Sequence, residues 1–221
     1  MIELPRRPRG LLVGLAALVS LVPSVTHAVA PPPCIQVHVA VDTSLADTTL
    51  KLIDGRGCGQ VVMAQDTVVN SVTFWLRARV PVFTYSAILY VTPVDSLGTP
   101  DVSRVLYTSP RQTGTIGGAS YLEAVKVAIA PPLILPGSGS YYFNISEASC
   151  LGTFLVAGHH GDAYGGGIAW KTGTTLCLDN GPGGPTGPDP NMDFIFDVEF
   201  CDTHSTPVLR RSWGEIKQIY R

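Results

Sequence analysis

The sequence predicts an all-β fold, an antiparallel β-sandwich of jelly-roll topology followed by a short C-terminal helix. Short stretches rich in β-branched and aromatic residues recur along the chain, and several alternate apolar with polar positions. Turns rich in Gly, Pro, Asn and Asp separate them. No helical pattern of about 10–15 residues lies between them, which disfavours a parallel α/β sheet. About ten such strands, in one domain of residues 34–201, are typical of a sandwich.

Composition limits the class of protein. Of the 221 residues, 14% are charged, against roughly 25% in an average soluble domain. The 23 Gly and 18 Pro exceed the average share, yet they stay below the roughly 25–30% that marks disorder. A net charge of -2 excludes the basic surface of a nucleic-acid binder. The chain is therefore expected to be folded and rich in turns, with no nucleic-acid partner.

Residues 1–28 have the pattern of a signal peptide. Three Arg residues precede an apolar run, Leu11–Val22, which is shorter than the about 20 residues that span a bilayer. Thr26-His27-Ala28 fits a small-x-small cleavage site. We expect cleavage after Ala28, with an uncleaved N-terminal anchor as the alternative. A Pro-rich lead, residues 29–33, and a mature chain without a transmembrane helix would follow, in a secreted, periplasmic or cell-surface location.

The first half of the domain contains six expected strands. In the first, Ile35, Val37, Val39 and Val41 alternate with more polar residues, as in a half-buried strand. Asp54-Gly55-Arg56-Gly57 is the turn that follows the second. The expected strands are Ile35–Val41, Thr49–Asp54, Gly59–Ala64, Val69–Arg79, Tyr85–Thr92 and Val105–Tyr107.

The second half begins with an expected Gly-rich turn, Thr113–Ala119. Tyr121–Ala130 can be read as a helix, but the alternation of Val125, Val127 and Ile129 favours a strand. Pro131-Pro132 is expected to end it. The strands after it are expected at Tyr141–Ser146, Phe154–Ala157, Ile168–Trp170 and Met192–Phe200. In the last, the residues Phe194, Phe196, Val198 and Phe200 share one face, and Asp193, Asp197 and Glu199 share the opposite, solvated face.

The five cysteines all lie beyond the signal segment, in a compartment where disulfides persist. Two bridges and one free thiol can be drawn in fifteen ways, and sequence does not select among them. Topology favours Cys34–Cys201, because the first and last strands would place these residues opposite each other if they are antiparallel neighbours. Cys150–Cys177 would close a loop of about 28 residues. Cys58 would then remain free.

Six short segments carry a resemblance to a known family: Gly59–Ala64, Asn70–Leu76, Ile88–Val91, Val105–Ser109, Tyr141–Phe143 and Gly161–Gly167. Together they resemble secreted bacterial jelly-roll modules of exported and surface-anchored proteins. In such modules a "Gly-Gln-x-Phe-x-Ala" strand precedes "Ser-Val-x-Phe-Trp-Leu", and here Val62 stands in place of the aromatic residue. The resemblance implies a binding or structural role, and some similar sandwiches bind carbohydrate.

Exposed aromatic rings are the usual basis of sugar binding, and three residues are candidates. Trp75 has the opposite strand parity to Phe74 and Leu76, which would place it on the outer face of its sheet. Tyr164 and Trp170 flank a triple glycine, where loops could form a shallow platform. Packing in the core or under a loop is the alternative for all three.

Acidic and histidine clusters offer two further sites. Asp189, Asn191, Asp193, Asp197 and Glu199 could supply oxygen ligands for a structural Ca²⁺. His159, His160 and Asp162 could hold a transition metal or serve a secreted hydrolase, which is the alternative function. Adjacent residues of a strand point to opposite faces, so at most one of the two histidines would easily join a given site. A polar turn is the simpler explanation of this cluster. No pair of carboxylates stands out for glycoside hydrolysis.

The tail, residues 202–221, joins a polar linker to an amphipathic pattern. Ser212 and Glu215 form a capping box, and Trp213, Ile216 and Tyr220 share one helical face. So short a helix is expected to dock, either on its own sandwich or as a sorting or attachment signal. Together these features predict an exported, non-catalytic binding or structural module whose partner is an extracellular glycan or another cell-surface component.

Overall fold

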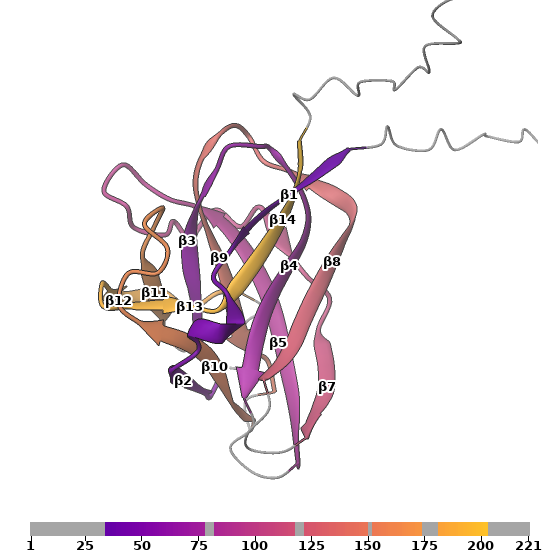
Figure 1. Ribbon diagram of the computed structural model, residues 1–221, viewed down its shortest axis with the longest axis vertical. Coiled ribbons are helices and arrows are strands. Elements are labelled where there is room, and N and C mark those ends of the chain that lie inside the picture. The colour runs from indigo at the N-terminus through magenta and orange to yellow at the C-terminus, as the bar shows by residue number, and fades with distance from the viewer. Residues whose placement is uncertain (1–33, 78–81, 118–121, 150–151, 174–180, 203–221) are drawn as a thin grey trace, which may run out of the picture. The chain divides into compact units, whose positions relative to one another are not determined.

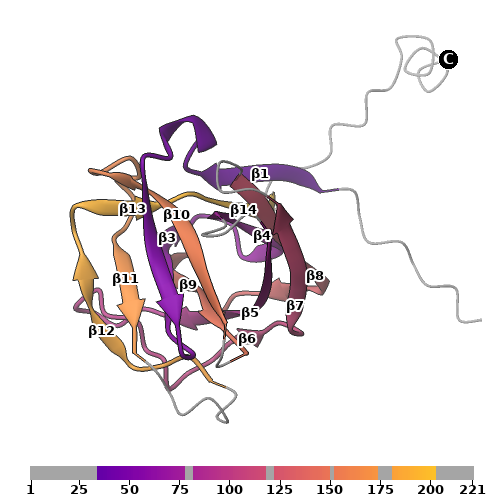
Figure 2. The ribbon, with the colours of Figure 1, turned by 90° about the horizontal axis from the view of Figure 1, so that it is seen from below.

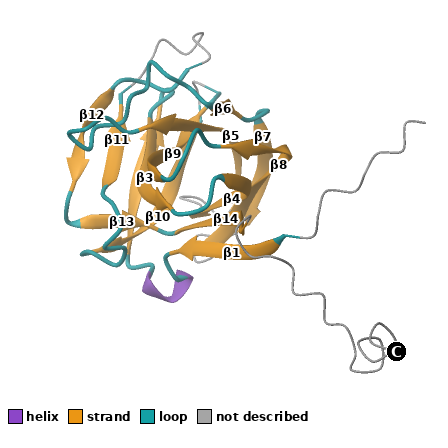
Figure 3. Ribbon diagram, turned by 90° about the horizontal axis from the view of Figure 1, so that it is seen from above, coloured by secondary structure: helices purple, strands orange, loops and turns teal. Residues whose placement is uncertain are grey.

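Two antiparallel sheets pack face to face in the computed structural model, which describes residues 34–77, 82–117, 122–149, 152–173 and 181–202 (Figure 1). The first sheet contains β1 (Ile35–Ala40), β2 (Thr48–Ile53), β4 (Val68–Arg77), β8 (Leu122–Ile134), β10 (Thr153–His160), β13 (Met192–Phe194) and β14 (Phe196–Asp202). The second contains β3 (Gly57–Ala64), β5 (Val82–Pro93), β6 (Tyr107–Thr108), β7 (Gln112–Gly117), β9 (Gly139–Glu147), β11 (Ala169–Thr172) and β12 (Pro185–Asp189). Figure 3 separates the two layers, and the all-β sandwich expected from the sequence is confirmed.

Four strand pairs are nested along the chain. The strand β1 pairs with β14, β3 with β9, β4 with β8, and β5 with β7, all of them antiparallel. Members of successive pairs lie in alternate sheets. The first sheet therefore contains the order β1-β14-β4-β8, and the second contains β3-β9-β5-β7. The strands β10 to β13 are inserted before the last member, β14, and extend both sheets on the same side (Figure 2).

The core lies between the sheets and is built by period-two alternation. Phe74 and Leu76 of β4 are buried, as are Phe143 and Ile145 of β9. The apolar positions predicted in the last strand segment are in the core as well, because Phe194, Phe196, Val198 and Phe200 are all buried. Apolar faces read from the sequence thus correspond to the inner faces of the two sheets.

The segment predicted as one strand, Met192–Phe200, is divided. The strand β13 ends at Phe194 and β14 begins at Phe196, with Ile195 between them. Ile195 is itself fully buried, and its backbone N–H donates to Ala157 O. Because the strand is interrupted at Ile195, its two parts have different neighbours. The strand β13 pairs with β10, whereas β14 pairs with β4 and β1.

Other strand boundaries also differ from the expectation. Thr113–Ala119, expected as a turn, contributes most of β7, which pairs with β5. The strand β8 continues through Pro131-Pro132, because a shift in its register with β4 accommodates residues that cannot donate to the ladder. The strand β12 was not predicted at all. It is an edge strand paired only with β11, where two prolines cost little.

The first strand is less buried than its alternation suggested. Ile35 is 56% exposed and Val37 is 36% exposed, whereas Val39 is half-buried and Val41 is buried. The reason is position, because β1 is the edge strand of its sheet and pairs only with β14. The prediction of a half-buried strand therefore holds only near its C-terminal end.

The ends of the sandwich are joined as the topology argument predicted. Cys34 and Cys201 form a disulfide with a Cα–Cα distance of 5.3 Å, within the usual disulfide range. Cys58 is free and buried in the core. Cys150 and Cys177 lie outside the described residues, as do the signal peptide 1–28, the lead 29–33 and, beyond Asp202, the tail with its expected helix. Within the described part of the chain, no helix has the length and apolar character needed to cross a membrane.

Candidate functional site

Trp75 lies on the outer side of β4, as its parity indicated. Its neighbours Phe74 and Leu76 are buried in the core, whereas Trp75 is half-buried. Opposite it in the ladder stands Ala124 of β8. The indole also packs against the edge of the buried cluster, so only part of its face is exposed.

Tyr164 connects the two sheets rather than forming an exposed platform. Met63 N–H of β3 donates to Tyr164 Oη at 3.0 Å, and Tyr164 N–H donates to Asp193 Oδ2 at 2.7 Å. Its ring meets Phe196 edge to face, with centroids 5.4 Å apart. Burial raises the pKa of the Tyr164 hydroxyl, more than the hydrogen bond from Met63 lowers it. These contacts indicate a structural role for the side chain.

Trp170 occupies the middle of β11, on the outer side of the second sheet. It stands opposite Gly59 of β3, and Tyr142 Oη donates to its backbone oxygen at 3.1 Å. The indole Nε1 is buried and has no hydrogen-bond partner among the described residues. Trp75 and Trp170 thus lie in different sheets, and neither lines a pocket described below, whereas Tyr164 lines one of them.

Asp193 is buried inside the sandwich, so the solvated face predicted for it is wrong. Gln60 Nε2 donates to Asp193 Oδ1 at 2.7 Å, and Gln60 Oε1 accepts from Phe194 N–H. Burial raises the pKa of Asp193, and the hydrogen bonds from Tyr164 and Gln60 oppose this shift. The break at Ile195 explains the error, because parity does not carry across an interrupted strand.

Glu199 is also buried, on the outer side of β14. Ser71 Oγ and Lys126 Nζ donate to its Oε2 at 2.9 and 3.1 Å. Desolvation raises the pKa of Glu199, but these two hydrogen bonds and the charge of Lys126 outweigh it and lower the pKa overall. The long side chain of Lys126 covers the carboxylate, which explains why this face is not solvated as predicted.

The remaining candidates for Ca²⁺ have separate partners. Asp197 bonds to His38 Nδ1 at 2.9 Å, and Asp189 bonds to Lys171 Nζ at 2.7 Å. Asp189 and Asp193 do line one small pocket with Asp162, of about 210 Å³. Within the described ranges, however, no three acidic, histidine or cysteine side chains group closely enough to hold a metal ion.

The two histidines at the end of β10 converge on one carboxylate. His159 Nδ1 lies 3.1 Å from Asp47 Oδ2, and His160 Nδ1 lies 3.2 Å from Asp47 Oδ1. The backbone N–H of His160 also donates to Asp47 and, as the largest cause, lowers the pKa of Asp47. Asp162 is exposed and lines a different site. The pair ties the segment before β2 to β10, and neither histidine lines a pocket described here.

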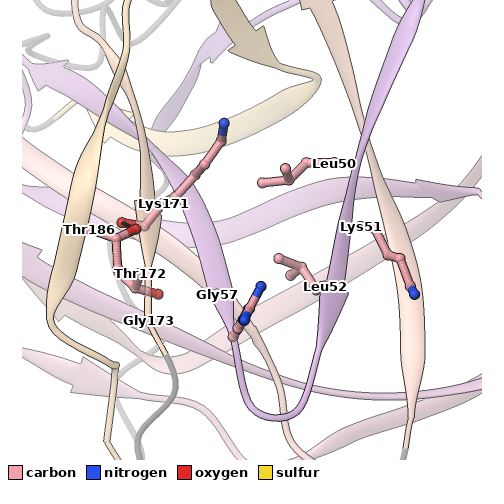
Figure 4. A pocket seen from close by; sticks show the side chains of 9 residues that line it. Leu50, Lys51, Leu52, Gly57, Lys171, Thr172, Gly173 and Thr186 are labelled. Carbon is pink, nitrogen blue, oxygen red and sulfur yellow. Dashed lines mark hydrogen bonds between the residues drawn. The ribbon is translucent and has the colours of Figure 1, made fainter.

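The pocket that sequence reasoning missed lies between β2 of the first sheet and β11 and β12 of the second (Figure 4). We call it the β2–β11 pocket; its volume is about 360 Å³. It is lined by Leu50, Lys51, Leu52, Arg56, Gly57, Lys171, Thr172, Gly173 and Thr186. Figure 4 shows Leu50 and Leu52 pointing from β2 into the space and Lys51 on the other side of that strand.

Local structure positions the polar groups of this pocket. Asp54 and Gly55 both have positive φ, of 53° and 73°, as a tight Asp-Gly turn between two strands requires. After this turn, Arg56 N–H donates to Ile53 O, and Arg56 O accepts from Glu147 N–H. The backbone of Arg56 is therefore held on both sides while its side chain is exposed.

Opposite the turn, β11 and β12 supply the other polar groups. Thr172 Oγ1 accepts from Asn144 Nδ2 at 3.2 Å, and Thr186 Oγ1 donates to Lys171 O at 3.1 Å. Thr172 is buried, whereas Thr186 is exposed and the lone pairs of its hydroxyl remain for a ligand. No local sequence signal marks this site, because its two walls are more than a hundred residues apart in the chain.

A second pocket opens between β1 and β3. It has a volume of about 330 Å³, and Val37, Val39, Met63, Tyr164 and Phe200 give it a mainly apolar lining. Val37 of β1, which the alternation placed on the buried face, is exposed and lies in this pocket. It offers fewer polar groups than the β2–β11 pocket.

Comparison of the chain with protein-family models, with curated proteins and with solved structures gives no match. The functional argument therefore rests on the geometry of the described residues.

Proposed function

We propose that this chain is an exported, non-catalytic β-sandwich module of jelly-roll topology that binds a carbohydrate at the cell surface or outside the cell. The β2–β11 pocket carries the proposal. It joins an apolar floor, Leu50 and Leu52, to the polar groups of Lys171 and Thr186, and a sugar ring presents the same mixture of apolar and hydrogen-bonding groups. Its volume is at the low end of the range of ligand pockets, about 300–1,000 Å³.

The strand order supports the jelly-roll topology. A jelly roll is an eight-stranded double sheet built from two Greek keys. The nested pairs β1–β14, β3–β9, β4–β8 and β5–β7 supply eight strands, four in each sheet. This order also agrees with the resemblance of the sequence to secreted bacterial jelly-roll modules.

Binding without catalysis is favoured by the residues that line the pocket. They include no carboxylate, histidine or cysteine, which are the common general acids, bases and nucleophiles. The hydrolase alternative would use His159 and His160, whose ring nitrogens instead meet Asp47 on the surface. Export rests on the signal-peptide pattern of residues 1–28 and on the Cys34–Cys201 disulfide, which is stable in oxidising compartments.

A glycan array probed with the purified full chain, with and without Ca²⁺, tests this function. The variant Thr186→Trp places a large ring in the pocket, and Thr115→Trp is the matched control at an exposed position of another edge strand, β7. We expect glycan binding by the wild-type chain and the control and its loss in Thr186→Trp. If the wild-type chain binds no glycan, the carbohydrate function is refuted and a structural surface role replaces it.

A further inference from the structure

The β2–β11 pocket is basic in a chain whose net charge is negative. Lys51, Arg56 and Lys171 are among its lining residues, and no acidic residue is. The whole chain has a formal net charge of -2. A positive site on such a chain favours a negatively charged ligand, because opposite charges concentrate the ligand at the site.

The three cations are not equivalent. Lys171 Nζ already forms an ion pair with Asp189 at 2.7 Å, which offsets part of its charge. Lys51 lies on the side of β2 that faces away from the space (Figure 4). Arg56 lines the pocket, and it has no ion-pair partner in the part of the chain that the structure describes. The available charge of the pocket therefore resides mainly on the Arg56 guanidinium.

The hydrogen-bonding side-chain groups of the pocket are also mostly donors. Arg56 offers up to five N–H donors, and Lys171 keeps two of its three. Against these donors, the side-chain acceptor of the pocket is Thr186 Oγ1, whose hydrogen is already used. A ligand that satisfies so many donors must be rich in acceptors, and a carboxylate accepts two parallel bonds from a guanidinium.

We infer that the β2–β11 pocket binds an acidic sugar, a uronate, through its carboxylate, and that Arg56 is the residue that selects the charge. The inference rests on the proposed carbohydrate-binding function and names its substrate class. The sugar ring would lie on Leu50 and Leu52 while its hydroxyls meet Thr186. Arg56 would bind the carboxylate of the sugar. Lys171 would donate to the same carboxylate while it keeps its ion pair with Asp189.

Titration of the ¹⁵N-labelled full chain with glucuronate and with glucose tests the inference. The two sugars differ only in a carboxylate where glucose has a hydroxymethyl group, and sodium acetate serves as the bare carboxylate. The amides of Gly57, Thr172 and Gly173 report binding in the pocket. Arg56→Gln removes the selecting charge. Arg104→Gln is the matched control, because it removes the same charge from an exposed arginine that does not line the pocket.

We expect glucuronate to shift these amides with a Kd at least about tenfold lower than that of glucose, since a hydrogen bond to a charged group is worth roughly a factor of ten or more. Acetate should bind more weakly than glucuronate. Arg56→Gln should abolish the preference and Arg104→Gln should retain it. Equal affinity for the two sugars, a preference that survives Arg56→Gln, or acetate binding as tightly as glucuronate would overturn the inference. If neither sugar shifts the amides and the glycan array also shows no binding, the proposed carbohydrate-binding function itself is overturned.

Discussion

Glu199 is a buried acid whose charge is maintained by two neighbours. Ser71 donates to its carboxylate from β4, which pairs with β14, and Lys126 donates from β8, the strand on the far side of β4. The side chain of Lys126 is 58% exposed and that of Glu199 only 9%. A half-exposed lysine thus covers an acid that has little access to water, and the contact contributes most when the acid is ionised.

Lys126→Met should lower the free energy of unfolding by about 0.5–1 kcal/mol at pH 7, the usual range for a partly exposed ion pair. The folded-state pKa of Glu199 is lowered from 4.5, so this stability is present above about pH 4.5 and is lost as the pH falls through the folded-state pKa. Urea unfolding at pH 7 and at pH 3 measures both effects. Lys51→Met, at an exposed lysine without an ion pair among the described residues, should leave stability unchanged. A loss of the same size at pH 3 would contradict the electrostatic account.

The strands β3 and β9 approach each other closely, and one glycine permits it. A Cβ atom added at Gly59 would overlap the carbonyl oxygen of Phe143 on β9. Gly59 lies between Cys58 and Gln60, both fully buried, and it faces Asn144 in the register. The close approach therefore depends on the absence of a side chain at this position, and a backbone carbonyl cannot rotate away as a side chain can.

Gly59→Ala should destabilise the fold by at least about 2 kcal/mol, because the β3–β9 ladder must shift to relieve the overlap. Gly137→Ala is the control, since nothing lies within 4 Å of a Cβ at that position, and it should change stability by less than about 0.5 kcal/mol. Thermal or urea unfolding compares the two variants. Equal stability of Gly59→Ala and the wild-type chain would show that the strands are not held this closely in solution.

At the scale of the whole molecule, the nested pairing brings the beginning and the end of the sandwich together. The strand β1 pairs with β14 along its full length, and the Cys34–Cys201 disulfide closes this pair across 167 residues of sequence. Because β1 is an edge strand with exposed apolar residues, the ladder with β14 and the disulfide are the main features that hold it to the sheet.

The double variant Cys34→Ala/Cys201→Ala should lose about 2–5 kcal/mol of stability, because a disulfide that closes so long a loop restricts the unfolded chain strongly. Urea unfolding under oxidising conditions measures the loss. The double variant should also respond less to a reducing agent than the wild-type chain does. If the two proteins unfold at the same urea concentration before reduction, the bond does not form in solution.

Sequence patterns by themselves determined the class of fold and most strand positions, and they favoured the Cys34–Cys201 disulfide. Period-two alternation places Phe74, Leu76, Phe196 and Val198 in the core, because a strand turns successive side chains to opposite faces wherever it is continuous. The same argument failed at Asp193, since the break at Ile195 interrupts the alternation, and at Val37, since an edge strand is not covered on both sides.

Only the tertiary structure decided where a ligand could bind. Arg56 follows an ordinary Asp-Gly turn and Lys171 lies in a four-residue strand, and neither has a local signal of function. They line one pocket because the pairing of β2 with β10 and of β11 with β3 places the two strands across from each other in different sheets, which no local pattern encodes. Conversely, Trp75 and Trp170, which sequence chemistry singled out, lie in different sheets. Residue type indicates what a side chain can do, whereas long-range pairing decides which side chains can act together.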